Sequence, residues 1–119
     1  MSSGGSKGVV LVVDDEPAIR LLCRVNLELA GYTVREAASL GDARAALVED
    51  DIAVVLLDMH VGTERADGFL DEIRALEIPV AAVTGSTDLG RLRGIADAVL
   101  AKPFAISELE ATVARLASG

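Results

Sequence analysis

The stretch Leu11–Pro17 reads LVVDDEP, an apolar run that ends at three consecutive acids and a proline. Residues 9–13 (VVLVV) are rich in β-branched side chains and predict a short strand buried on both faces. Pro17 fits the first turn of a following helix. Neighbouring carboxylates repel one another and are costly to desolvate, so acids at the end of a buried strand predict a positively charged partner there.

The same alternation of strand and helix patterns continues along the chain. Ala53–Leu57 and Val80–Thr84 predict two more buried strands, and Tyr32–Arg35 and Asp97–Ala101 predict weaker strands nearer the edges. Helical patterns cover residues 17–30, 40–49, 69–76, 89–95 and 105–116. Five strand–helix repeats predict an α/β domain with a parallel sheet and right-handed crossovers.

Two details of the helices are specific enough to test. In the first helix the apolar residues Ile19, Leu22, Val25 and Leu29 recur with helical spacing. In the last helix Ser107 is the expected N-terminal cap. That helix begins at Ala105 and runs to the end of the sequence, so we expect no output domain after it.

Length and charge restrict the class of protein. The 119 residues fit one domain, with residues 1–7 expected as a flexible tail and residues 8–119 as the domain. The net charge of −8 disfavours binding to nucleic acid or to an anionic membrane, and no apolar run approaches the roughly 20 residues of a membrane span. The single cysteine, Cys23, excludes an internal disulfide, suits a reducing cytoplasm, and is expected to be an inert buried thiol.

Chemistry in an open parallel sheet gathers where the strands end at their carboxyl edge. The predicted strands end at Asp14 and Asp15, at Asp58, at Thr84 and near Lys102. Each residue taken alone has an ordinary explanation as a turn, cap or surface residue. The prediction rests on their conjunction: three carboxylates and one ammonium leave a net charge of −2, which suits one divalent hard cation such as Mg²⁺.

A cation, a lysine and a threonine hydroxyl together supply what a phosphoryl group needs. The cation and the ammonium neutralise its oxygens, and the hydroxyl donates a hydrogen bond. A carboxylate beside the metal can then act as a nucleophile and form an acyl phosphate. Asp58 is the predicted nucleophile, because it stands alone at the end of a central strand.

These motifs resemble the receiver domain of bacterial two-component response regulators. VVDDEP, VVLLDM, AVTGS and AKPF stand in the order and spacing of that family, and the similarity extends from about Gly8 to Ser118. The resemblance implies a flavodoxin-like, doubly wound, five-stranded parallel sheet of order 2-1-3-4-5 with helices on both faces. It also implies a phosphoacceptor in phosphorelay signalling rather than an enzyme, acting in the cytoplasm.

The resemblance further assigns roles to individual residues. Asp58 would receive a phosphoryl group from a sensor histidine kinase or a histidine phosphotransfer protein. Mg²⁺ would be bound by Asp15, by Asp58 and by the backbone carbonyl of His60, and by Asp14 through water. Thr84 and Lys102 would contact the phosphoryl oxygens. The peptide bond before Pro103 would be cis.

Three departures from the family pattern affect signal output. Val99 stands where receivers usually carry the aromatic residue that swings inward on activation. The segment from Thr84 to Lys102 is short by about one helical turn, which predicts a stubby fourth helix. The loop after Asp58 is longer than usual and contains His60, whose position in the family influences the lifetime of the acyl phosphate.

The first four residues of the AVTGS motif suggest a subfamily. Residues 82–85 (AVTG) are similar to the Phe-Ala-Thr-Gly signature of a group of receivers found among single-domain regulators, which also lack the aromatic. With no effector expected on this chain, it would act by binding an output protein that the sequence does not identify, or by passing on phosphoryl groups.

Three alternatives from other classes use related features. A flavodoxin-like cofactor module is disfavoured because the acids at residues 14–16 would repel a bound phosphate. A phosphatase of the haloacid dehalogenase type needs a second aspartate two positions after the nucleophile, where His60 stands. A pseudo-receiver, which binds partners without being phosphorylated, is the remaining rival, because Val99 replaces the usual aromatic.

Overall fold

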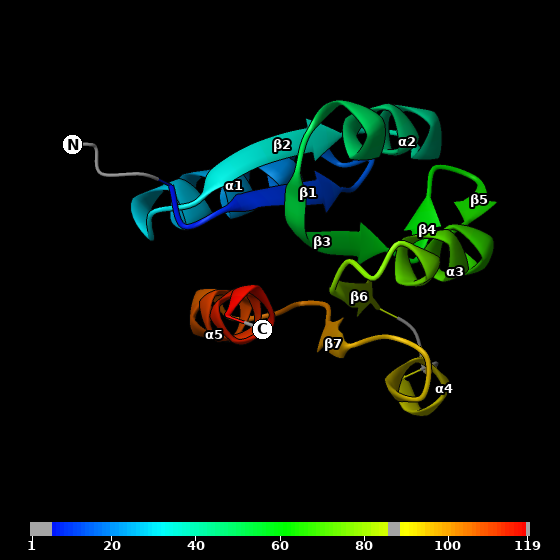
Figure 1. The fold of residues 1–119 in the computed structure, drawn as a ribbon. Coiled ribbons are helices and arrows are strands. Elements are labelled where there is room, and N and C mark those ends of the chain that lie inside the picture. The colour runs from blue at the N-terminus through cyan, green and yellow to red at the C-terminus, as the bar shows by residue number, and fades with distance from the viewer. Residues whose placement is uncertain (1–5, 86–88, 119) are drawn as a thin grey trace.

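Five parallel strands form the central sheet of this computed structural model, which describes residues 6–85 and 89–118 (Figure 1). Their spatial order is β2-β1-β3-β6-β7. The strands are β1 (Val9–Val13), β2 (Thr33–Ala37), β3 (Ile52–Asp58), β6 (Val80–Thr84) and β7 (Ala98–Ala101). A separate two-stranded hairpin, β4 (His60–Val61) and β5 (Glu64–Arg65), follows β3. With the hairpin set aside, the order is the predicted 2-1-3-4-5, so the doubly wound, flavodoxin-like fold is confirmed.

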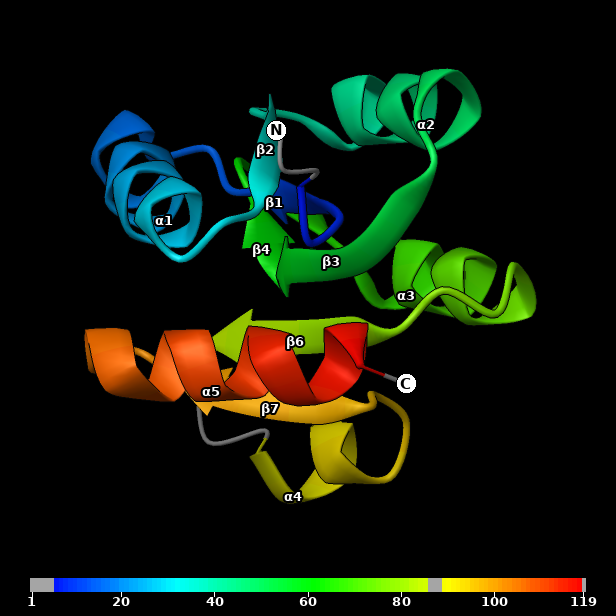
Figure 2. The same cartoon turned by 60° about the vertical axis from the view of Figure 1, so that its left-hand side comes forward.

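In the described residues, four helices connect consecutive strands of the sheet and a fifth follows β7, and together they cover both faces of the sheet (Figure 2). They are α1 (Pro17–Leu29), α2 (Leu40–Glu49), α3 (Asp67–Ala75), α4 (Leu89–Arg93) and α5 (Ile106–Ala117). α4 has five residues, in agreement with the expectation of a stubby fourth helix. None of the helices in residues 6–85 and 89–118 is long and apolar enough to cross a membrane.

The core consists of two layers separated by the sheet. Because successive side chains of a strand point to opposite faces, Val10 and Val12 pack against α1 and α5, whereas Leu11 and Val13 pack against the layer of α2, α3 and α4. The central strands β1, β3 and β6 are therefore apolar except for Asp58 and Thr84 at their carboxyl ends, as expected for strands covered on both sides. The edge strand β2 differs, because it contains Arg35 and Glu36. Cys23 and Leu27 anchor α1 in the first layer, and Phe69 anchors α3 in the second.

The buried face of α1 differs from the apolar pattern in the sequence. Cys23 and Leu27 are buried, whereas Leu22, Val25 and Leu29 are 39%, 46% and 82% exposed. Ile19, one turn before Cys23, is the only residue of the predicted pattern that packs against the core. α1 is apolar around much of its circumference, so the spacing of its leucines and valines does not decide which side meets the sheet.

Local details at the chain ends also differ from expectation. Ser107 lies inside α5; the helix instead begins after Ala105, whose N–H donates to the Glu108 carboxylate at 2.9 Å. Lys7, placed in the expected tail, donates its backbone N–H to the carbonyl of Gly31 at 2.9 Å. Ser6, also placed in that tail, accepts a hydrogen bond on its Oγ from the Thr33 N–H at 3.1 Å, and residues 1–5 lie outside the described residues.

Candidate functional site

The carboxyl ends of β1 and β3 bring three acids together. Asp14 and Asp15 follow β1, Asp58 is the last residue of β3, and one carboxylate oxygen from each lies within 4.8 Å of the others. Asp14 and Asp58 are buried and Asp15 is exposed. Since β1 and β3 are adjacent and parallel, the register that pairs Val13 with Leu57 places these acids side by side.

Lys102 is the positive partner of this acid cluster. Its Nζ lies 3.2 Å from Oδ2 of Asp14 and 3.4 Å from Oδ2 of Asp58, and 3.9 Å from Oε1 of Glu16. The lysine follows β7, at the far side of β6 from β3. Its backbone N–H donates to the carbonyl of Thr84 at 2.8 Å, which fixes the lysine to the end of the neighbouring strand.

The protonation behaviour of the cluster follows from burial and charge. Burial is the largest influence on Asp58 and raises the pKa of its carboxyl; the hydrogen bond from the His60 N–H lowers it, the charge of Asp14 raises it again, and the net change is upward. Burial alone would lower the pKa of Lys102, but the charges of Asp58 and Asp14 outweigh it and raise that pKa. The ammonium is therefore held in its charged form, while the environment disfavours a charged Asp58 in the absence of a cation.

The residues at the other predicted positions lie at the same edge of the sheet. Thr84 ends β6, is buried, and pairs with Ala101 of β7. The peptide bond between Lys102 and Pro103 is cis. Val99 lies within β7, half-buried, and packs against the layer of α2, α3 and α4. The structure thus gathers the acids, the threonine and the lysine at the carboxyl ends of the strands, and Val99 lies in the middle of the outermost strand β7.

His60 belongs to the hairpin that follows Asp58, an element the sequence did not predict. Its N–H donates to Oδ1 of Asp58 at 3.1 Å, and its Nε2 lies 2.9 Å from the guanidinium of Arg65, its partner across the hairpin. The Arg65 side chain also pairs with Asp67 at 3.0 Å, and Asp67 pairs with Arg91 of α4 at 2.8 Å. Burial acts to raise the pKa of Asp67, but the two guanidiniums outweigh it and lower that pKa. A continuous polar bridge therefore joins the loop after Asp58 to α4.

The loop of residues 14–16 between β1 and α1 is called the acid loop. Sequence reasoning also missed Arg20, which contacts this loop from α1. Its guanidinium donates to the backbone carbonyl of Asp14 at 2.7 Å and pairs with Glu36 of β2 at 3.1 Å. A signal for it exists in the sequence. Side chains of a helix lean toward its N-terminus, so an arginine in the first turn after the acids leans back over them.

The donor set fits a hard divalent cation. Three carboxylates converge within 4.8 Å, and after Lys102 is counted the cluster retains two negative charges. Oxygen ligands of this kind suit Mg²⁺ or Ca²⁺, whereas softer metals prefer sulfur and imidazole donors. Asp14, Asp15 and Asp58 are the side chains that could hold such an ion.

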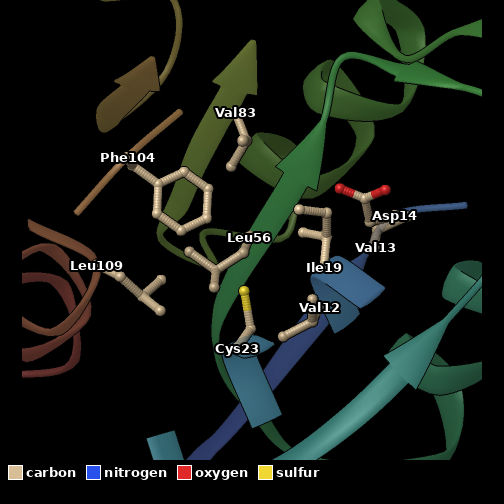
Figure 3. Close-up of a pocket in the computed structure, with 9 residues that line it drawn as sticks. All are labelled: Val12, Val13, Asp14, Ile19, Cys23, Leu56, Val83, Phe104 and Leu109. Carbon is tan, nitrogen blue, oxygen red and sulfur yellow. The ribbon is translucent and has the colours of Figure 1, made fainter. Parts of the chain in front are cut away.

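A small apolar hollow lies beside Asp14, between α1, α5 and the sheet (Figure 3). Leu56 and Val83 of the sheet face it, with Phe104 and Leu109 on the α5 side and Ile19 and Cys23 on the α1 side. Burial in these surroundings, and next the charge of Asp14, raises the pKa of the Cys23 thiol from 9.0 to about 11. The expectation of a buried, inert thiol is consistent with this environment.

The doubly wound sheet, with an acid cluster and a lysine at its carboxyl edge, has the architecture of a phosphorelay receiver. The model of the response regulator receiver domain matches residues 10–114. The chain belongs to this family of signalling modules.

Its curated relatives include transcriptional regulators. The chain is 35% identical to the DNA-binding dual master transcriptional regulator RpaA of Synechocystis sp., over 90% of this chain and 48% of that protein. It is also 35% identical to the phosphate regulon transcriptional regulatory protein PhoB of Pseudomonas aeruginosa, over 90% of this chain and 49% of that protein. The chain therefore spans about half the length of these curated relatives.

Solved structures of similar length show the same fold. The chemotaxis protein CheY4 of Vibrio cholerae superposes with a TM-score of 0.82 at 26% identity, over 92% of this chain and 98% of that one. A CheY-like receiver domain protein of Methanospirillum hungatei gives a TM-score of 0.84 at 26% identity, over 93% and 94% of the two chains.

Proposed function

We propose that this chain is a phosphoacceptor: Asp58 accepts a phosphoryl group from a histidine of a sensor kinase or a phosphotransfer protein, with the assistance of Mg²⁺. The observation that carries the proposal is the convergence of three carboxylates within 4.8 Å, two of them in contact with Lys102, at the ends of parallel strands. This arrangement offers a nucleophile, a cation site and a fixed positive charge within one cluster of side chains.

In the proposed reaction a carboxylate oxygen of Asp58 attacks the phosphorus atom of the donor. A new oxygen–phosphorus bond forms while the phosphorus–nitrogen bond to the donor histidine breaks, and the imidazole leaves with the electron pair and takes up a proton. Lys102 would neutralise a phosphoryl oxygen, and the Thr84 hydroxyl would donate a hydrogen bond to another. Bound Mg²⁺ would supply the remaining charge neutralisation, held by Asp15, Asp58 and the His60 carbonyl, with Asp14 acting through water.

Phosphorylation would then change a protein-binding surface. The affected loops are those after β3 and β6, because Asp58 and Thr84 end these strands. We propose that the output is a protein partner in the cytoplasm and that nucleic acid and membranes are not direct ligands of this domain, in keeping with the net charge of −8. We also propose that the domain belongs to the receiver subfamily with the Phe-Ala-Thr-Gly signature, which is found among single-domain regulators and which residues 82–85 resemble.

Intact mass after incubation with acetyl phosphate tests the proposal. The wild-type chain should gain one phosphoryl adduct when Mg²⁺ is present and none when EDTA replaces it. Asp58→Asn should gain none, whereas Asp71→Asn, a matched change at an exposed aspartate of α3, should behave as wild type. The absence of any adduct, also with phosphohistidine donors, would support the rival reading of a pseudo-receiver, which the valine at position 99 favours.

His60 offers a finer test of the same site. Its side chain contacts Arg65 while its N–H holds Asp58, so it lies next to the acyl phosphate that would form. We propose that it tunes the lifetime of that phosphate. The rate of dephosphorylation should change in His60→Ala, and an unchanged rate would remove this role.

A further inference from the structure

Arg20 connects the acid loop to the edge strand of the sheet. One guanidinium nitrogen donates to the Asp14 carbonyl at 2.7 Å, and Nε pairs with Oε1 of Glu36 at 3.1 Å. The other carboxylate oxygen of Glu36 accepts from Arg24 at 2.7 Å. The Arg20 side chain is only 16% exposed, so these are contacts of a largely buried guanidinium rather than of a solvated surface pair.

The local fold brings these three residues together. Pro17 starts α1 immediately after the acids, which places Arg20 in its first turn, and helical side chains lean toward the N-terminus of their helix. Glu36 pairs with Val12 in the parallel register of β1 and β2, two residues from Asp14. Glu36 therefore holds the guanidinium from the sheet side while Arg20 reaches the loop.

All four polar groups of Asp14, its N–H, its carbonyl and its two carboxylate oxygens, make hydrogen bonds. Its N–H donates to the Ala37 carbonyl at 3.1 Å, its carbonyl accepts from Arg20, and its Oδ1 accepts from the Glu16 N–H at 2.9 Å. Its Oδ2 accepts from Lys102 at 3.2 Å. Because the Asp14 carbonyl belongs to the peptide that leads into Asp15, fixing it also fixes the direction in which Asp15 leaves the strand.

Arg20 and Lys102 bring positive charge to the cluster in different ways. Lys102 touches the carboxylate oxygens themselves, where it competes with a cation for them. Arg20 touches the carbonyl and Glu36, so within the described chain its charge offsets the repulsion among the acids without occupying a carboxylate of the cluster. A group of this kind favours cation binding by holding the ligands in place.

We propose that Arg20 is a positioning residue for the divalent cation, and that Glu36 orients it. The inference rests on the proposed metal-assisted function of the acid cluster. Arg20 contacts neither the ion nor the phosphoryl group; it sets the acid loop so that Asp14 and Asp15 present their oxygens together. Loss of Arg20 should therefore weaken Mg²⁺ binding more than it slows phosphoryl transfer once the site is filled.

Mg²⁺ titrations of four variants test the inference. The dissociation constant would be measured by calorimetry and by the rise of Tm with MgCl₂, and the rate of modification by acetyl phosphate would be measured across the same titration. Arg20→Met should weaken Mg²⁺ binding about tenfold, with a maximal rate within about twofold of wild type at saturating Mg²⁺. Arg20→Lys should recover part of the affinity, because it keeps the charge.

The other two variants separate positioning from general stability. Glu36→Gln should weaken Mg²⁺ binding about threefold, because Arg20 remains but loses its orienting charge. Arg24→Met removes a partner of Glu36 that does not contact the acid loop, and it should bind Mg²⁺ as wild type does. If Arg20→Met does not fold, the Arg20→Lys and Glu36→Gln affinities decide the question.

Two outcomes would count against the inference, and they are distinguishable. If wild type shows no Mg²⁺-dependent rise of Tm and no Mg²⁺-dependent adduct, the proposed function itself fails. If wild type responds to Mg²⁺ and the Arg20 and Glu36 variants lose stability equally with and without Mg²⁺ at unchanged affinity, Arg20 merely ties α1 to β2 and the inference is overturned.

Discussion

Replacement of Lys102 by methionine isolates the charge balance of the acid cluster. The ammonium lies 3.2 Å from one largely buried carboxylate and 3.4 Å from another. At an effective dielectric constant of about 20, each such contact corresponds to a gross attraction of about 5 kcal/mol. Most of this is offset by desolvation, and removal of one partner from a buried ion pair costs about 3–5 kcal/mol in net terms. We expect Lys102→Met to lose about that much free energy of unfolding at pH 7 without Mg²⁺.

The stability lost in Lys102→Met should depend on both pH and Mg²⁺. Because the folded pKa of Lys102 is raised, its stabilisation is fully present below the unfolded lysine pKa of about 10.4 and is lost as pH rises through the folded value. Mg²⁺ should stabilise Lys102→Met more than wild type, because the ammonium no longer competes for the carboxylates. Tenfold tighter binding corresponds to an extra gain of about 1.4 kcal/mol at saturating Mg²⁺.

Urea unfolding followed by circular dichroism, in EDTA and in MgCl₂, would measure both effects. Lys7→Met is the matched control, because Lys7 is the other lysine of the chain and its ammonium lies 5.7 Å from the centre of the Tyr32 ring rather than beside the acids. It should cost at most about 1 kcal/mol and leave the response to Mg²⁺ unchanged. The reasoning is refuted if Lys102→Met is as stable as Lys7→Met in EDTA, or if both gain equally from Mg²⁺.

Three further changes probe other parts of the site. Asp58→Asn should raise Tm in EDTA by about 2–4 °C, because burial raises the pKa of Asp58 and disfavours its charged form; a lowered Tm would contradict this. Cys23 should resist thiol reagents at pH 8 until urea unfolds the protein, and fast labelling of the native protein would refute this. Because the folded pKa of Cys23 is raised, the thiol stabilises the fold only below pH 9. Between pH 9 and 11 wild type should therefore lose about 2–3 kcal/mol of stability relative to Cys23→Ala. Asp67→Asn removes the ion pairs to Arg65 and Arg91, and should cost less than about 1 kcal/mol while speeding amide hydrogen exchange in α4; unchanged exchange would show that the bridge does not hold the helix.

The strands and the acid cluster were predictable because their signals are short-range or topological. Continuous β-branched runs mark the buried strands, and the carboxyl ends of parallel strands must share one edge. That reasoning places Asp14, Asp58 and Lys102 together, although 88 positions separate the first and last of them in the sequence. The predicted bounds of β2, Tyr32–Arg35, were wrong, because the strand runs from Thr33 to Ala37.

The features that the sequence did not reveal depend on the packing of neighbouring elements. Which side of α1 meets the sheet is decided by how the helix packs on β1 and β2, and that packing buries Cys23 while Leu29 stays exposed. The β4–β5 hairpin contains only two residues in each strand, which is too short for an alternating pattern to be recognised in the sequence. The contact of Arg20 with Asp14 needs the position of Glu36 on the neighbouring strand, which depends on the register of pairing.

The division of the core into two layers has a consequence for how the protein can change over evolution. Side chains such as Val12 and Leu11 follow one another in the sequence, yet they pack in layers on opposite sides of the sheet. Substitutions at sites that share no neighbours combine nearly additively, whereas substitutions within one layer are coupled. Epistasis should therefore be confined within each layer. The α1–α5 side can drift toward a new partner while the side that contains α3 and α4 keeps its own packing.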